Sequence, residues 1–91
     1  MALAILFHPR SMTQAKYDQV IERLEAAGAA APRGRQHHVC YGDDGDLRVL
    51  DVWESRESFE EFGQTLMPIL QEAGIDVGEP DVRPVHNVIE G

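Results

Sequence analysis

The side chains best suited to chemistry are the imidazole of His38 and the carboxylate of Asp51. They stand in two strand-like runs that flank Asp44-Gly45, a dipeptide typical of a two-residue hairpin turn. With that turn His38 lies opposite Asp51, whereas a longer loop would place His37 there. A carboxylate beside an imidazole fixes its tautomer and favours its protonated form, as a general base in a closed pocket requires. A catalytic pair and a structural polar pair in a dimer core both remain open.

Several other side chains are candidates for ligand binding. Trp53 shares a strand face with Asp51 and could stack on an aromatic ligand, although a Trp at a strand end is more often core. His86 belongs to a run expected two strands away from Asp51, so one ligand could reach both, although a backbone hydrogen bond at a dimer interface is commoner. The helix wall of a pocket would come from Tyr17, Phe59, Phe62, Leu66 and Met67, a stripe that is core by default.

Metal and cofactor binding are not expected. His37 and His38 are adjacent, so in a strand their side chains point to opposite faces and cannot hold one ion together. No further Cys or His stands at zinc-site spacing. Cys40 is the only cysteine, and its apolar neighbours favour an inert, buried thiol in a reducing cytoplasm.

The strand that carries Asp51 has apolar side chains on both faces. Read alternately, Leu47, Val49 and Trp53 share the face of Asp51, whereas Leu50 and Val52 lie on the other. A strand of this kind is covered on both sides. A first strand is expected over residues 3–7. A last one is expected over residues 81–89, where Pro84 is tolerable only at a sheet edge.

Two helices are predicted between these strands. The first follows a cap at Ser11 or Thr13 and ends at Gly28, and the second follows Ser55 and ends at Gly74. Pro68 lies inside the second helix. It lacks an amide donor and crowds the preceding turn, so it predicts a kink or a break near residues 63–67 that would shape a pocket wall.

The resulting order, β-α-β-β-α-β over residues 1–91, predicts one ferredoxin-like α+β domain. A four-stranded antiparallel sheet would carry two helices on one face. A domain of 91 residues buries only about 60–65% of the surface that its unfolded chain exposes, so it gains from oligomerisation. The uncovered face is therefore expected to meet a second copy across a two-fold axis, giving a homodimer.

The charge balance argues against two classes of partner. The chain has 16 acidic and 8 basic residues and a formal net charge of −8. A protein of this charge is repelled by phosphate backbones and by anionic lipid surfaces. Nucleic acid and membrane partners are therefore not expected, and a small molecule is the expected ligand.

The run from Asp51 to Phe59, after the His38-Val39 hairpin, resembles the antibiotic biosynthesis monooxygenase-like family of dimeric α+β barrel proteins. The likeness extends to Met12-Thr13, Tyr17-Asp18, Leu66-Met67-Pro68 and Pro84-Val85-His86-Asn87. It implies a homodimer whose two sheets form a barrel, with a pocket in each subunit between sheet and helices. Relatives bind small aromatic or polycyclic compounds; some oxygenate them without metal or flavin, and others bind haem. Many relatives carry a His where this chain has Phe62.

Two functions from different classes follow. One is a cofactor-independent monooxygenase, or an isomerase or cyclase, in which His38 with Asp51 removes a proton from a phenolic or enolisable substrate and Trp53 positions the ring. The other is a non-catalytic ligand-binding or accessory dimer with the same pocket. A closed cavity beside a His-Asp contact favours the first, and a filled core favours the second.

Overall fold

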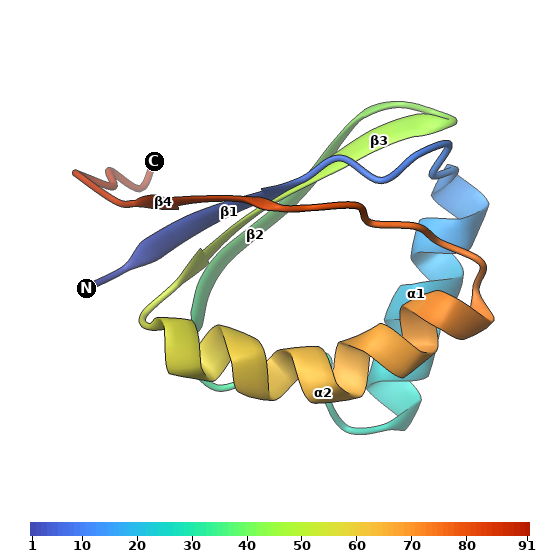
Figure 1. Ribbon diagram of the computed structural model, residues 1–91, viewed down its shortest axis with the longest axis horizontal. Coiled ribbons are helices and arrows are strands. Elements are labelled where there is room, and N and C mark those ends of the chain that lie inside the picture. The colour runs from blue at the N-terminus through green and yellow to red at the C-terminus, as the bar shows by residue number, and fades with distance from the viewer.

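The computed structural model describes residues 1–91 and has the element order β-α-β-β-α-β (Figure 1). One antiparallel sheet has the strand order β2-β3-β1-β4. Two helices lie on the same side of this sheet (Figure 1), and the predicted ferredoxin-like α+β fold is confirmed for the chain. The elements are β1 (Leu3–Phe7), α1 (Gln14–Ala26), β2 (Arg35–Asp43), β3 (Asp46–Trp53), α2 (Arg56–Glu72) and β4 (Asp81–Pro84).

Both helices begin and end at the residues that the sequence indicates. The Thr13 side chain accepts a hydrogen bond from the Lys16 amide at the start of α1, and Ser55 accepts one from the Ser58 amide at the start of α2. These bonds satisfy amides that have no partner within the helix. Gly28 and Gly74 follow the helices with φ of 72° and 70°, a conformation that costs glycine little.

The hairpin has the register that a two-residue turn predicts. Asp43 pairs with Asp46 around Asp44-Gly45, and His38 pairs with Asp51, so the alternative that opposes His37 to Asp51 is excluded. The ladder is irregular only at its far end. There Arg35 pairs with Trp53 and His37 pairs with Val52, which leaves one extra residue on β2 as a bulge.

Helix α2 runs through Pro68 without a break, so the predicted break is excluded. Its ribbon changes direction in the second half (Figure 1), in line with the predicted alternative of a kink. One expectation about an element boundary was wrong. Strand β4 ends at Pro84 and not at Ile89. Its partner β1 begins at Leu3, and the last hydrogen bond joins the Val85 amide to the Ala2 carbonyl, so the residues beyond Val85 have no strand to pair with.

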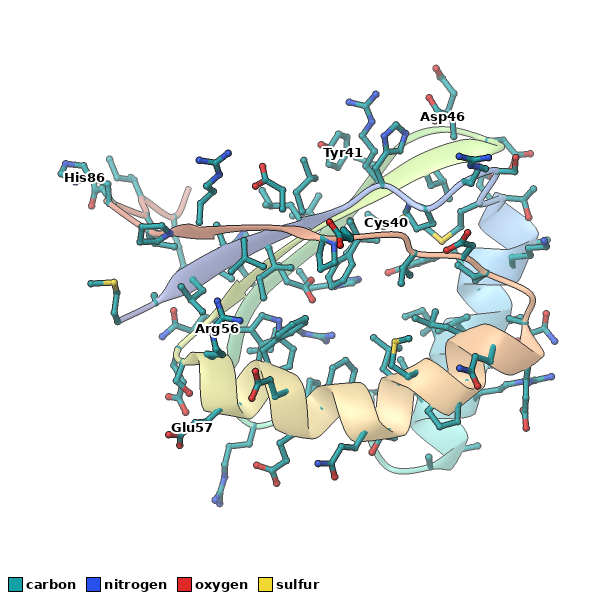
Figure 2. All side chains as sticks on the ribbon, viewed as in Figure 1. Cys40, Tyr41, Asp46, Arg56, Glu57 and His86 are labelled. Atoms are coloured by element: carbon teal, nitrogen blue, oxygen red, sulfur yellow. The ribbon has the colours of Figure 1, made fainter.

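The core fills the space between the helices and the sheet. Ile5 of β1 and Trp53 of β3 are fully buried, and the cluster around them also contains Met12, Val20, Leu24, Leu47, Val49, Phe62, Leu70 and Ile75. The opposite face of the sheet is uncovered, and Figure 2 shows Tyr41 projecting from it on the side away from the helices. No helix of the structure is long and apolar enough to cross a membrane.

Candidate functional site

A chain of hydrogen bonds links α1, β2 and β3 on the helix-covered face of the sheet. The Tyr17 hydroxyl lies 2.6 Å from Nε2 of His38, and Nδ1 of His38 lies 2.6 Å from Oδ1 of Asp51. The Trp53 indole donates to the other oxygen of Asp51 at 3.2 Å. The predicted contact between His38 and Asp51 is therefore present, and Tyr17 and Trp53 extend it at both ends.

Burial and neighbouring charges act on the protonation of the Tyr17 hydroxyl. Burial raises the pKa of the Tyr17 phenol, and the charge of a Cys40 thiolate would raise it further, whereas the Arg35 guanidinium opposes the rise. Tyr17 thus keeps its proton at neutral pH. Its hydroxyl donates a hydrogen bond to Nε2 of His38 in the ring tautomer that carries its hydrogen on Nδ1, facing Asp51. Every buried side-chain polar atom in the protein has a partner.

Beside this chain lies a cavity of about 70 Å³ between the two helices and the sheet. A cavity needs only about 10–15 Å³ to hold one water molecule, so this one has room for several waters or for part of a small ligand. Its polar lining comes from Tyr17, Arg35, His38 and Asp51. The remainder is mostly apolar and includes Val20, Leu24, Val49, Phe62, Leu66 and Leu70. The arrangement joins an acid-base chain to an apolar pocket.

The structure brings only some of the expected ligand-binding residues to this cavity. Tyr17, Phe62 and Leu66 line it together with His38 and Asp51. Trp53 is fully buried behind this lining and packs against Phe62, with ring centroids 5.3 Å apart, so it is a core residue.

Met67 and His86 lie away from the cavity, as does Phe59. Met67 keeps 44% of its surface exposed, because α2 turns the side chains of Phe62, Leu66 and Leu70, spaced by four, toward the cavity. His86 is exposed and follows the end of β4, and Figure 2 shows it at the end of the sheet far from α1. Met67, His86 and Phe59 are therefore not placed to contact a ligand in this cavity.

Arg35 is a cavity residue that sequence reasoning missed. If side chains alternated strictly from His38, Arg35 would lie on the outer face of β2. The bulge before His37 shifts this alternation by one residue, so Arg35 pairs with Trp53 and lies on the inner face. The Arg35 guanidinium donates to the Ala30 carbonyl at 3.0 Å and lies 5.9 Å from the centre of the Phe62 ring. Gly28 and Gly34 indicate a loop before Arg35, but no residue in the sequence indicates the bulge.

Cys40 and the histidines form no further site. The Cys40 thiol is half-buried and not fully buried as expected, and burial, followed by the charge of Asp18, raises its pKa. It therefore remains a protonated thiol of low reactivity at neutral pH. No group of three or more His, Cys, Asp or Glu side chains is placed to hold a metal ion.

Solved structures share this fold over the whole chain. SnoaB from Streptomyces nogalater, described as a cofactor-independent oxygenase, superposes in a mutant form with a TM-score of 0.71 at 14% identity, covering 99% of this chain and 98% of that one. A candidate antibiotic biosynthesis monooxygenase from Chloroflexus aurantiacus gives a TM-score of 0.66 at 16% identity with full coverage of both chains. Another, from Caulobacter crescentus CB15, gives a TM-score of 0.66 at 16% identity, covering 97% of this chain and 91% of that one.

These similarities confirm the expected resemblance at the level of the fold. No protein-family model matches the sequence, and the comparison with curated proteins gives no match. The chain therefore has the fold of the antibiotic biosynthesis monooxygenase structures, and its chemistry must be argued from its own residues.

Proposed function

We propose that this protein is a cofactor-independent enzyme that removes a proton from a compact phenolic or enolisable compound. The resulting anion then reacts with molecular oxygen in the same pocket. The observation that carries the proposal is the chain from Tyr17 through His38 to Asp51, which opens on a mostly apolar cavity. A base held by a carboxylate beside an apolar binding space is what proton abstraction from a small molecule requires.

The proton would move in two linked transfers. The Tyr17 hydroxyl gives its hydrogen to Nε2 of His38 and receives the hydrogen of the ligand hydroxyl on its own oxygen. The ligand becomes an oxyanion, His38 becomes an imidazolium, and Tyr17 ends as the neutral phenol that it was. Because the Tyr17 oxygen already lies 2.6 Å from Nε2, the transfer from Tyr17 to His38 needs no rearrangement.

Asp51 supports the base without touching the ligand. It lies 2.6 Å from Nδ1 of His38 and is nearly fully buried, so its negative charge favours the imidazolium at short range. The indole of Trp53 holds the second oxygen of the same carboxylate. Asp51 and Trp53 are thus positioning residues for His38, and Tyr17 is the group that meets the ligand.

Oxygenation is the reaction that we assign to the anion. A phenolate is rich in electrons, and a phenol with one molecule of O₂ gives a quinone and one molecule of water, which balances without a cofactor. The description of SnoaB as a cofactor-independent oxygenase on the same fold supports this assignment. The apolar lining of the cavity suits both the aromatic ring and dissolved oxygen.

Oxygen consumption with a panel of small phenols and hydroquinones, in the presence of a metal chelator, tests the proposal. We expect turnover to fall at least about 100-fold in Tyr17→Phe and in Asp51→Asn, as is usual when acid-base catalysis is lost. Tyr41→Phe is the matched control, because Tyr41 lies on the other face of the sheet and does not line the cavity. Ligand binding without any oxygen consumption would contradict the enzyme and support an accessory binding protein.

We further propose that the protein is a homodimer joined through the uncovered face of the sheet. This face presents Val39 and Leu50, which pair across β2 and β3 and remain 39% and 37% exposed, with Tyr41 beside them. Leu6 of β1 extends the same row, since it pairs with Leu50. A second copy is the simplest partner for an apolar sheet face in so small a domain.

Sedimentation equilibrium at micromolar concentration tests the dimer. Obligate dimers commonly bury more than about 2,000 Å² in total, so the dimer should resist dilution. A monomer at these concentrations would contradict the proposal. It would leave the cavity argument intact, because every cavity residue named above belongs to one chain.

A reducing compartment such as the cytoplasm is the setting that we propose for this dimer. Cys40 is the only cysteine, so a single chain cannot form a disulfide. Small domains of oxidising compartments commonly depend on disulfides. Fractionation of the source cells would test the setting.

A further inference from the structure

Arg35 is the only lysine or arginine that lines the cavity. It begins strand β2, and the bulge after it turns its side chain to the same face as His38 and Asp51. A permanent positive charge therefore lines this mostly apolar space, together with the side chains of the proton-accepting chain. The proposed proton chemistry does not use it.

The guanidinium has binding capacity to spare. None of the ion pairs in the structure includes Arg35. Its one hydrogen bond goes to the Ala30 carbonyl, whereas a guanidinium carries five N–H donors in a planar fork. Asp51, the carboxylate in the same lining, is already engaged by His38 and Trp53. The cation thus lacks a partner of opposite charge within the protein.

The charge of Arg35 acts on the Tyr17 hydroxyl, the group that receives the ligand proton in the proposed function. Among the influences on Tyr17, Arg35 is the one that lowers the pKa of the phenol, against the larger effect of burial. The guanidinium also rests over the ring of Phe62 at 5.9 Å, which holds it against the cavity wall. A second oxygen placed beside the Tyr17 hydroxyl would feel the same attraction.

We propose that Arg35 binds the oxyanion that a ligand acquires when it gives its proton to the Tyr17–His38–Asp51 chain, and that the pocket thereby selects weakly acidic hydroxyl compounds, namely phenols and enols. This inference rests on the proposed function. The ligand O–H bond breaks, its proton enters the chain at Tyr17, and the negative charge left on the oxygen faces the guanidinium. The interaction is stronger with the anion than with the neutral ligand, so it favours the transfer.

The placement of the groups favours a developing anion over a permanent one. A carboxylate ligand would satisfy Arg35 but would bring no proton to Tyr17, and it would place a second full negative charge near Asp51. A neutral hydroxyl enters an apolar cavity at lower cost than a charged group. The hydroxyl then gives its proton to the chain, and the anion that results binds to Arg35.

Binding of para-nitrophenol, whose ionisation is visible in its absorbance spectrum, tests the inference. Three ligands are compared in absorbance and calorimetric titrations: para-nitrophenol, its neutral isostere para-nitrotoluene, and benzoate as a permanent carboxylate. The proteins are wild type, Arg35→Gln, Arg35→Lys and Tyr17→Phe. Arg33→Gln is the matched control, since it removes an exposed arginine two residues away.

The wild type should lower the pKa of bound para-nitrophenol and bind it as the phenolate. Arg35→Gln should weaken phenolate binding by about 10- to 100-fold, the usual size for a lost charged hydrogen bond. The affinity of this variant for para-nitrotoluene should stay within twofold of the wild-type affinity, which would also show that the variant is folded. Arg35→Lys should recover part of the loss, and Arg33→Gln should bind like wild type.

Unchanged phenolate binding in Arg35→Gln would overturn the role of Arg35, and benzoate binding more tightly than the phenolate would overturn the selectivity. Either result would leave the proposed function standing if Tyr17→Phe still abolished ionisation of the bound phenol. Failure of both para-nitrophenol and para-nitrotoluene to bind would instead count against the pocket, and so against the proposed function itself.

Discussion

The two faces of strand β3 carry similar apolar side chains but differ in how they are covered. On the helix side Leu47, Val49 and Trp53 are buried within one chain. On the other side Val52 is buried, but Leu50 stays 37% exposed next to Val39. The covered face combines the core with the only large polar cluster inside the protein. The open face has no such chemistry, and its apolar surface is what a second copy would bury.

The largest effect is expected from breaking the covered face. Trp53→Ala would leave a void beside Phe59 and Phe62 and would remove the indole donor from Asp51. The free energy of unfolding should fall by about 3–5 kcal/mol, as measured by urea unfolding followed by circular dichroism.

Leu50→Ala serves as the comparison for Trp53→Ala. It should lower the free energy of unfolding by less than about 1 kcal/mol at protein concentrations where the chain is monomeric. Equal losses in the two variants would mean that the two faces do not differ in the way described.

The next largest effect is expected at the open face. Leu50→Glu would place an unpaired charge in the proposed dimer interface and should weaken self-association at least about 100-fold, or roughly 3 kcal/mol. Sedimentation equilibrium measures this change. Met67→Glu adds the same charge to an exposed apolar side chain on α2 and should leave association unchanged. The same weakening in both variants would indicate a general charge effect and no specific interface.

The comparison of the two faces also shows what could be predicted from the sequence. The pairing of His38 with Asp51 follows from the Asp44-Gly45 turn, because a two-residue loop fixes the register of its own hairpin. The Thr13 and Ser55 caps are equally local. The alternation in β3 indicated correctly which side chains share a face, since pleating alone sets that pattern.

Features that depend on distant partners could not be predicted. Arg35 enters the cavity because of a bulge that shifts alternation by one residue, and no residue type marks that bulge. The end of β4 depends on where β1 begins, so His86 falls beyond the sheet. The contact of Tyr17 with His38 requires α1 to pack across β2, and periodicity does not give that packing. Met67 is different, because the spacing of four from Phe62 to Leu66 and Leu70 already pointed to another face of α2.

A smaller effect is expected from the titration of Tyr17. Its pKa lies above the ordinary value of 10.0, chiefly because the phenol is partly buried. A raised folded-state pKa contributes stability that is fully present below the unfolded value and is lost as the pH rises through the folded value. Absorbance titration should show one tyrosine ionising late, and Tyr17→Phe should remove that step. Complete ionisation of the wild type at the ordinary value would contradict this account.

The smallest effect is expected at the exposed contact between His8, which follows β1, and Asp46 of the hairpin. The hydrogen bond from His8, 2.7 Å long, lowers the pKa of Asp46 below its ordinary value of 3.8. This contribution is present above the unfolded pKa and is lost as the pH falls through the folded one. In His8→Ala the titration of the Asp46 carboxyl, followed by NMR, should return toward the ordinary value, with little change in stability because both groups are exposed. An unchanged Asp46 titration would show that His8 is not the cause.

The central claim is that the covered face holds a proton-accepting chain, and ¹⁵N NMR of the His38 ring tests it most directly. In the free protein at neutral pH we expect a neutral ring with the hydrogen on Nδ1, facing Asp51, and with Nε2 accepting from Tyr17. Saturation with para-nitrophenol should convert His38 to the doubly protonated imidazolium while the ligand appears as the phenolate. A ring that stays neutral while para-nitrophenol binds, or that carries its hydrogen on Nε2 in the free protein, would contradict the claim.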